Sequence, residues 1–425
     1  MFKAHPIRSI SIYVVATLFL VYEMALQVSP SVMTESLMSA FAIGAGKLGI
    51  MASFYYYSYA IMQVPAGLLH DRFGPRRLIT FSAILCALGA FFFGSTTAFA
   101  PAAMGRFLMG VGSAFAFIGV LVVTARWFDK RYFALLVGVG QFLAAVGALG
   151  GELPLAYAVD HLGWRASMLL LALIGGVVAL LAVFIIRNYP PEVVPHHKQE
   201  DGLRLIVKIK EILTHGQTYA ICAFAFCAWG PVLAIAALWG VPYLMVLHGI
   251  ENTQAAFAIS MLWVGVAISS PFWGWISDHL GRRNLPLQIC SSIGLVASIF
   301  LIYVTTVPFW GTCVLLLLIG VAGAGQIVTF ALVRENNRPS MTGAAVGLNN
   351  MAVVAGGALF QPLVGWLLYL FWNGATRAGI PTYTVGNYQI ALAIVPICFL
   401  VALLISLFYI RETFCKSRFE HKRKA

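Results

Sequence analysis

The stretch GLLHDRFGPRR, residues 67–77, interrupts a chain that is otherwise apolar. Uncharged segments flank it: LGIMASFYYYSYAIMQVPA comes before it and LITFSAILCALGAFFFGSTTAFA follows it. Each flank has roughly the 20 residues that an α-helix needs to cross the hydrocarbon core of a membrane. The pattern therefore predicts two membrane-spanning helices joined by a short polar loop.

The composition extends this interpretation to the whole chain. The 425 residues are 60% hydrophobic and 10% charged, with a mean hydropathy of +0.88. An ordinary soluble domain is about one-quarter charged. The apolar runs are continuous and do not alternate, which favours helices over the strands of a membrane barrel. We therefore expect an all-α polytopic membrane protein.

Twelve apolar stretches are long enough to span a membrane. Their expected bounds are 10–36, 46–69, 77–97, 101–125, 132–157, 165–187, 218–247, 253–276, 285–306, 308–333, 342–371 and 387–410.

The net charge of +12 is distributed unevenly over the loops. If both termini are cytoplasmic, the loops on that side hold all but four of the 27 Lys and Arg residues, the exceptions being Lys47, Arg106, Arg165 and Arg377. This bias is the positive-inside rule. It predicts a multi-pass protein of a bacterial inner membrane with both termini cytoplasmic. The basic charge is then a topology signal, and we expect no nucleic-acid partner.

The longest polar stretch, residues 187–217, divides the chain near its middle. We expect an N-terminal six-helix bundle over 1–187, a cytoplasmic linker over 188–217, a C-terminal six-helix bundle over 218–411 and a basic cytoplasmic tail over 412–425. Within the linker, LRLIVKIKEIL has the pattern of a short amphipathic helix on the membrane surface. A plain tether and a regulatory segment both fit this linker.

A second polar loop, GWISDHLGRRN at residues 274–284, follows the eighth span as the first loop follows the second. One offset, 207 residues, pairs Gly67 with Gly274, Asp71 with Asp278, Gly74 with Gly281, and Arg76 with Arg283. Several matches at one offset indicate a duplicated six-helix unit. Duplicated halves are typical of one large class of secondary transporters.

The pattern G-x-L-x-D-R-x-G-x-R-R after the second span, its degenerate copy and the twelve spans resemble the major facilitator superfamily. The resemblance implies that the loop latches the two bundles on the cytoplasmic side when the carrier faces outward. Asp71 would then cap a helix of the opposite half, where a carboxylate gains from the helix dipole. The implied gate residues are Gly67, Asp71, Arg72, Gly74, Arg76, Asp278, Gly281 and Arg283.

The two glycines of the first loop have expected roles in this gate, in which Gly67 and Gly74 would allow close packing and a tight turn. The simpler alternative is a solvated loop that only keeps its charges out of the membrane.

Ionisable side chains inside a membrane are costly, so each is a functional candidate. Glu23 lies midway along the first span, with Tyr22 beside it and Gln27 one turn later on the same face. We expect Glu23 to take up and release a proton as the cavity changes sides. A structural Glu, hydrogen-bonded to another helix, is the alternative.

Arg106 and Glu152 lie towards the outer ends of the fourth and fifth spans. With Gly110 and Gly112, Arg106 matches the family pattern R-x-x-x-G-x-G, which implies proton coupling or binding of an anionic substrate group. Arg can hold a carboxylate through two hydrogen bonds. An internal pair between Arg106 and Glu152 is the alternative, and Glu152 is a second candidate for proton coupling.

The other expected substrate contacts are aromatic or neutral side chains within the spans, any of which could instead serve packing. Together with Arg106, the expected substrate-binding set is Tyr22, Gln27, Tyr56, Tyr59, Trp229, Trp239, Tyr243, Gln326, Asn349 and Asn350.

We therefore expect a monomeric, proton-coupled carrier that works by alternating access in the lipid bilayer. One membrane arginine among neutral groups favours import of a small organic anion or zwitterion, such as a carboxylate metabolite or siderophore. Drug exporters of the family carry G-P-x-x-G-G on the fifth helix, whereas VGALGG, residues 146–151, lacks the Gly-Pro pair. A multidrug or metabolite exporter stays the alternative because of Glu23 and the aromatic residues.

A non-transporting receptor or scaffold is the alternative from another class of protein. The chain has no phosphate-binding glycine loop and no His/Cys set with metal spacing. We therefore expect no enzyme activity, no cofactor and no metal.

Overall fold

The computed structural model describes residues 6–129, 132–190, 216–338, 341–377 and 379–418. Within these helices only the backbone is described for Val64, Leu68, Asp71, Ala134 and Thr342. The amphipathic helix expected within the linker lies outside the described residues.

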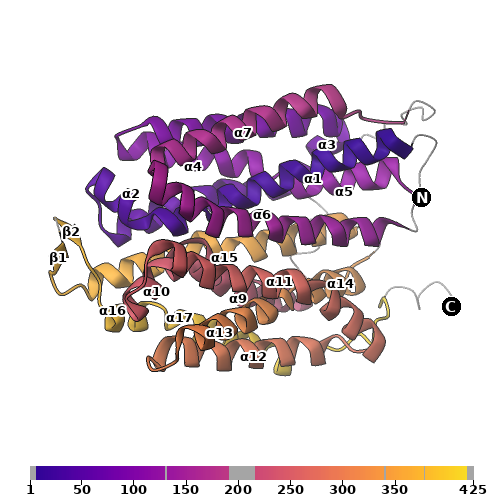
Figure 1. Ribbon diagram of the computed structural model, residues 1–425. Coiled ribbons are helices and arrows are strands. Elements are labelled where there is room, and N and C mark those ends of the chain that lie inside the picture. Colours follow the sequence, from indigo (N-terminus) through magenta and orange to yellow (C-terminus); the bar gives the residue numbers. More distant parts are fainter. Residues whose placement is uncertain (1–5, 130–131, 191–215, 339–340, 378, 419–425) are drawn as a thin grey trace.

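The first half of the chain forms the helices that lie uppermost in Figure 1. They are α1 (Pro6–Val28), a 3-10 turn (Ser29–Met33), α2 (Thr34–Phe41), α3 (Ala45–Ser95), α4 (Phe99–Ser113), α5 (Ala116–Trp127), α6 (Phe133–Leu162) and α7 (Trp164–Ile185).

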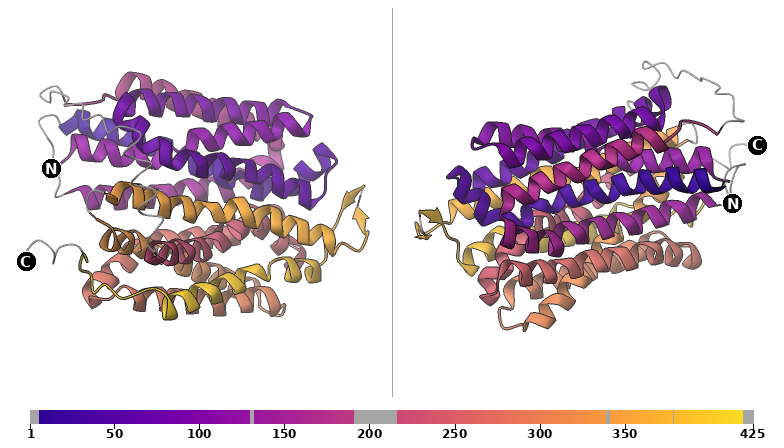
Figure 2. Two further views of the ribbon diagram at one scale, coloured as in Figure 1. Left: turned by 180° about the vertical axis from the view of Figure 1, so that it is seen from behind. Right: turned by 45° about the horizontal axis from the view of Figure 1, so that its top comes forward.

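The second half lies beside the first (Figures 1 and 2). It comprises α9 (Gly216–Ala234), a π-helical turn (Ile235–Trp239), α10 (Gly240–His248), α11 (Asn252–Leu280), α12 (Asn284–Tyr303), α13 (Phe309–Ala324), α14 (Ile327–Asn336), α15 (Thr342–Leu370), β1 (Thr376–Arg377), β2 (Ile380–Pro381), α16 (Val385–Ala391) and α17 (Ile394–Phe408).

Helix α3 is too long to be one span, because 51 residues at about 1.5 Å each would extend far beyond the hydrocarbon core. It is interrupted at Gly74, where φ is 77° and ψ is 163°. Only glycine adopts such a conformation readily. The loop that separates the second and third predicted spans is therefore a sharp turn at Gly74, followed by Pro75 and a new helical segment.

Eleven helical stretches of the described chain are long and apolar enough to cross a membrane. They correspond to eleven of the twelve predicted spans, and the remaining one, 46–69, is the part of α3 before Gly74. Several spans contain breaks that the sequence pattern did not predict. The fourth is divided between α4 and α5, and the tenth between α13 and α14.

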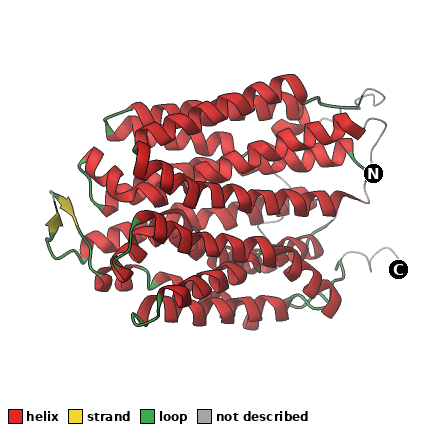
Figure 3. Cartoon of the chain, viewed as in Figure 1, coloured by secondary structure: helices red, strands yellow, loops and turns green. Residues whose placement is uncertain are grey.

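Helix α1 begins and helix α17 ends at the same end of the molecule (Figures 1 and 2), which we call the terminal end. The opposite end carries α2 and a small antiparallel hairpin, in which Thr376 of β1 pairs with Pro381 of β2 (Figure 3). We call it the hairpin end. Large apolar side chains such as Leu173, Phe184 and Trp310 are exposed on the helices, as expected of a surface that faces lipid.

Candidate functional site

A cavity of about 110 Å³ lies between the two halves of the molecule. Its walls come from α1, α3, α5 and α6 of the first half and from α9, α11, α13, α14 and α15 of the second. Six of the predicted residues line it: Glu23, Gln27, Tyr59, Trp229, Gln326 and Asn350. The structure thus brings together a carboxyl group, several carboxamides and aromatic rings at the interface of the halves.

Glu23 is the one acidic residue among the described residues of the cavity wall, and its exposed fraction is only 1%. The Tyr55 hydroxyl donates a hydrogen bond of 2.8 Å to Glu23 Oε2. The Tyr55 ring stacks on Tyr59, with the ring centroids 5.9 Å apart. The carboxyl group is therefore held in one orientation by α3 while it remains on the cavity wall.

Arg106 does not line the cavity and is 1% exposed. Its Nη1 donates to the Leu26 carbonyl at 2.8 Å and its Nη2 to the Gln27 carbonyl at 3.4 Å. Its guanidinium carbon lies 4.8 Å from the centre of the Tyr55 ring. Both carbonyls belong to the last turn of α1, where helical carbonyls lack intrahelical partners and favour a cation. Arg106 thus lies one layer behind the wall that carries Gln27.

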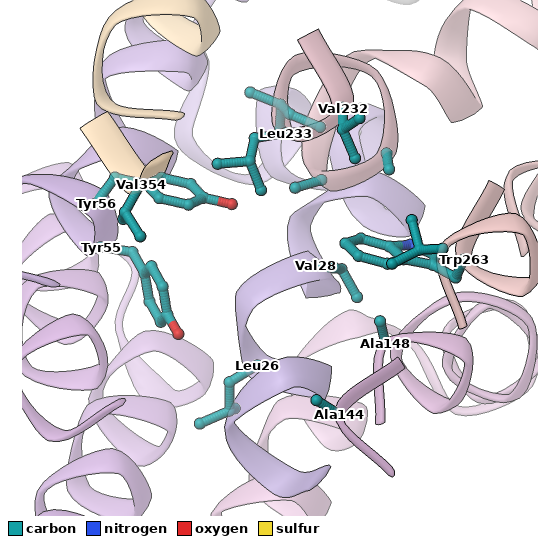
Figure 4. Close-up of a cluster of buried hydrophobic side chains, with 14 of the residues drawn as sticks. Leu26, Val28, Tyr55, Tyr56, Ala144, Ala148, Val232, Leu233, Trp263 and Val354 are labelled. Carbon is teal, nitrogen blue, oxygen red and sulfur yellow. The ribbon is translucent and has the colours of Figure 1, made fainter. Parts of the chain in front are cut away.

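Side chains from both halves meet around the end of α1, as Figure 4 shows for Leu26, Val28, Tyr55 and Trp263. These side chains form a buried, mainly apolar cluster between the two halves.

The expected alternative of an Arg106–Glu152 pair does not hold in this structure. Glu152 is fully buried on α6, and its Oε2 accepts a hydrogen bond of 2.9 Å from the Ser31 hydroxyl. Ser31 belongs to the 3-10 turn that follows α1. Arg106 and Glu152 therefore each bind the chain around the end of α1 and not each other.

The remaining predicted contacts serve packing in this structure. Trp239 Nε1 donates to the Gln361 carbonyl at 2.9 Å, the Tyr243 hydroxyl donates to the Leu301 carbonyl at 3.0 Å, and Asn349 Nδ2 donates to the Thr329 hydroxyl at 2.9 Å. Tyr22 and Tyr56 are buried against Gly175 and Gly357. None of these five lines the cavity.

Two conspicuous cavity residues escaped the sequence analysis. Gln141 of α6 and Trp263 of α11 both line the cavity, and the Trp263 ring lies 6.3 Å from that of Trp229. Gln141 is the one polar side chain within the apolar stretch VGVGQFLAAVG, and a lone polar side chain in a membrane span could have indicated a cavity residue. The sequence around Trp263 gave no such indication, because a tryptophan in a membrane helix usually faces neighbouring helices or lipid.

The predicted gate residues of the first half lie around the turn at Gly74 within α3, at the terminal end of the molecule. The backbone N–H of Arg76 donates to Asn188 Oδ1 at 3.1 Å, and Arg76 Nε donates to the Val183 carbonyl at 3.1 Å. Arg72 is exposed, and the Asp71 side chain lies outside what is described. A Cβ atom at Gly67 would meet nothing within 4 Å, so Gly67 is not closely packed in this structure, and its packing in a closed gate stays a prediction.

The predicted gate residues of the second half, Asp278 and Arg283, form a compact charged cluster with Glu335. Arg283 Nη1 lies 2.7 Å from Asp278 Oδ1, and Arg283 Nη2 lies 2.7 Å from Glu335 Oε1. Gly281 ends α11 with a φ of 61°. Burial acts to lower the pKa of Arg283, but the hydrogen bonds to the Glu335 and Asp278 carboxylates outweigh it, so the pKa lies above its usual value. The partners of Arg283 all belong to the second half and those of Arg76 to the first, so these hydrogen bonds and ion pairs do not cross between the halves.

The described hydrogen bonds that join the halves lie elsewhere. At the hairpin end Asn252 Nδ2 donates to Asp160 Oδ1 at 2.8 Å, and the Ala45 N–H donates to the Tyr383 hydroxyl at 3.0 Å. Deeper in the molecule, Asn350 Nδ2 donates to Gln63 Oε1 at 2.6 Å. The halves are thus tied together from the hairpin end inward to the cavity.

The described residues contain no group of three or more His, Cys, Asp or Glu side chains that is placed to hold a metal ion. The described wall of the cavity offers hydrogen-bonding side chains, one carboxyl group and aromatic rings.

The fold and the cavity between duplicated halves define a multi-pass membrane transporter of the secondary class, and not an enzyme. The sequence model of the Major Facilitator Superfamily matches residues 15–361 and 234–425. The chain belongs to this family.

Two relatives of this chain are transport proteins by name. The chain is 26% identical over 284 residues to "Uncharacterized transporter YybO" of Bacillus subtilis, a match that covers 61% of this chain and 63% of YybO. It is 22% identical over 365 residues to "Probable hexose phosphate transport protein" of Chlamydia pneumoniae, covering 79% of this chain and 76% of that protein.

Among solved structures, a bacterial homolog of the human lysosomal transporter Spinster, inward-facing and unoccupied, matches with a TM-score of 0.78. The match covers 98% of this chain and 99% of that chain at 15% identity. It supports the fold alone.

Proposed function

We propose that this chain is a proton-coupled transporter that imports a small organic anion or zwitterion by alternating access. It would act as a monomer in a bacterial inner membrane, with both termini cytoplasmic. The two bundles would span 1–187 and 218–411, joined by the linker 188–217 and followed by the tail 412–425. In this orientation the terminal end faces the cytoplasm and the hairpin end faces outward.

The observation that carries the proposal is the position of Glu23. It is the acidic group of a cavity between the two halves, and the Tyr55 hydroxyl fixes its Oε2 at 2.8 Å. A carboxylate without a counter-charge is unfavourable in such a place, whereas a neutral carboxyl is tolerated. Binding of a proton to Glu23 therefore accompanies binding of a substrate that brings a negative charge of its own.

The contacts between the halves support alternating access. The outward side is closed by Asn252 with Asp160 and by Tyr383 with Ala45, while the loops at the cytoplasmic side bond within their own halves. The cavity would then communicate with the cytoplasm. In the opposite state the predicted gate around Asp71 and its copy at Asp278 would close the cytoplasmic side.

Two observations favour an organic anion. One relative is named for hexose phosphate transport. In this chain Arg106 places a positive charge behind the wall that carries Gln27. Arg106 would act on the substrate through the electrostatic potential of the cavity and not by direct contact.

The test is uptake into proteoliposomes that contain the purified full chain, with a proton gradient imposed across the membrane. We expect the gradient to drive accumulation of an organic acid. Glu23→Gln should abolish this accumulation but retain exchange of labelled for unlabelled substrate. The matched control is Glu35→Gln, which removes an exposed carboxylate at the start of α2. Equal gradient-driven uptake by Glu23→Gln and the native chain would contradict the proposal.

One observation favours a second candidate, export of cationic compounds. Glu23, Trp229 and Trp263 line the cavity without any Lys, Arg or His among its described wall residues. Carboxylates and aromatic faces attract cations. Gradient-driven efflux of a lipophilic cation would select this function. A chain that binds compounds but moves none would instead be a receptor.

A further inference from the structure

The number of charges around the cavity restricts what can enter it. Among the described residues, Glu23 lies buried on the wall itself, Arg106 lies buried behind it and donates to the Gln27 carbonyl, and Glu152 lies buried against Ser31 just after α1. Within the described chain Arg106 donates to main-chain carbonyls, so no carboxylate within hydrogen-bond distance offsets its positive charge. When Glu23 and Glu152 are both neutral, the region around the cavity therefore carries one positive charge.

A substrate with one negative charge balances this positive charge, whereas a substrate with two negative charges exceeds it. A monocarboxylate would bring the region to neutrality. A phosphate ester or a dicarboxylate would leave an excess negative charge in a medium of low dielectric constant, which is costly. A zwitterion has no net charge, so it adds no excess negative charge to this region.

The neutral part of the wall adds a second requirement. The carboxamides of Gln27, Gln141, Gln326 and Asn350 come from four different segments and from both halves. Gln326 lies in the break between α13 and α14, and its Oε1 is buried without a hydrogen-bond partner. A buried acceptor without a partner costs free energy until a donor arrives. The substrate should therefore carry an O–H or N–H group for Gln326.

We infer that the cavity binds compounds with a single carboxylate and at least one O–H or N–H donor, and excludes phosphate esters and dicarboxylates. This inference rests on the proposed transport function. The inferred class of substrate differs from the hexose phosphate in the name of one relative, because a phosphate ester carries nearly two negative charges at neutral pH.

The test is thermal unfolding of the purified full chain with D-gluconate, L-serine, hexanoate, succinate or glucose 6-phosphate at equal concentrations. A compound that binds only the native state raises the melting temperature. We expect a rise with D-gluconate or L-serine, and none with succinate or glucose 6-phosphate. Hexanoate should bind more weakly because it lacks the donor. The D-gluconate and L-serine arms distinguish hydroxy acids from zwitterions.

The variant Gln326→Leu tests the donor requirement. Loss of one neutral hydrogen bond should weaken binding of the effective compound about five- to tenfold, and leave binding of hexanoate unchanged or stronger. The matched control is Gln288→Leu, which removes a half-buried carboxamide of α12 outside the cavity.

Stabilisation by glucose 6-phosphate or succinate would overturn the inference. An unchanged melting temperature with every compound would overturn it too. These outcomes differ from failure of the transport proposal. If D-gluconate or L-serine binds but no proton gradient drives its uptake, the inferred class holds and the proposed function fails. If a gradient drives uptake of glucose 6-phosphate, the function holds and the class fails.

Discussion

Asp160 and Thr253 are joined by a hydrogen bond of 2.6 Å, although 93 residues separate them in the chain. Asp160 belongs to the last turn of α6 in the first half, and Thr253 to the first turn of α11 in the second. Asn252 donates to the other carboxylate oxygen of Asp160 and also to the Val32 carbonyl, at 3.1 Å. A carboxylate at the N-terminus of a helix is favoured by the helix dipole. This contact closes the hairpin end.

Asp160→Asn should weaken this closure. The contact is exposed, so we expect its loss to cost about 1 kcal/mol, which shifts an equilibrium between two conformations about fivefold. Spin labels attached at Leu162 and Glu251, both exposed, should then show a larger population at long distance. Thr253→Val should have a smaller effect in the same direction. An unchanged distance distribution in both variants would mean that the contact does not bias the conformation.

Gly110→Ala and Gly67→Ala should have opposite effects on folding. A Cβ atom at Gly110 would lie 2.0 Å from the Tyr55 carbonyl oxygen, so α3 and α4 would have to separate. At Gly67 nothing lies within 4 Å, and Ala favours a helix over Gly by about 1 kcal/mol. We expect poor recovery of folded Gly110→Ala on gel filtration and normal or better recovery of Gly67→Ala. If Gly67→Ala folds but does not transport, Gly67 acts in the gate of the other state.

Arg106→Met should destabilise the protein in the absence of substrate. It removes charge-assisted hydrogen bonds to the Leu26 and Gln27 carbonyls, and a loss of about 2–4 kcal/mol is expected. Arg106→Lys should recover only part of this, since a single ammonium group does not reproduce the guanidinium fork. Thermal unfolding measures both, with Arg377→Met at the exposed strand β1 as the control. Unchanged stability with lost substrate affinity would instead indicate direct substrate contact.

The spans and the duplication were predictable because they depend on local properties of the sequence. Length and apolarity define a membrane helix, and the loops at Gly74 and Gly281 reappear at one offset. Gly74 and Gly281 both have positive φ in the structure, as their loops require. The break between α13 and α14, which places Gln326 in the cavity wall, has no such local signature.

Which side chains face the cavity could not be predicted, because the rotation of each helix depends on its partners. Asn349 and Asn350 are adjacent, yet Asn350 lines the cavity and Asn349 packs against Thr329. Tyr59 and Tyr56 lie within one turn, and only Tyr59 lines the cavity. The sequence also does not reveal that the Leu26 and Gln27 carbonyls would bind Arg106, because main-chain acceptors carry no residue signal.

Glu412→Gln should lower stability at neutral pH but not in acid. Glu412 follows α17 and accepts hydrogen bonds from the backbone N–H groups of Arg283 and Asn284 at 2.9 Å, which begin α12. Burial acts to raise the pKa of Glu412, but these N–H groups and those of Phe414 and Thr413 outweigh it, so the pKa lies below its usual value.

A carboxyl group whose pKa is lowered by folding stabilises the protein above its unfolded pKa, and this contribution disappears as the pH falls through the folded pKa. Glu412 is partly exposed, so the expected loss in Glu412→Gln at pH 7 is about 0.5–1 kcal/mol, the size of a helix cap. Thermal unfolding of both proteins between about pH 7 and pH 3 should show the difference shrink below about pH 4. A difference that stays constant over this range would show that the ionised carboxylate does not cap α12.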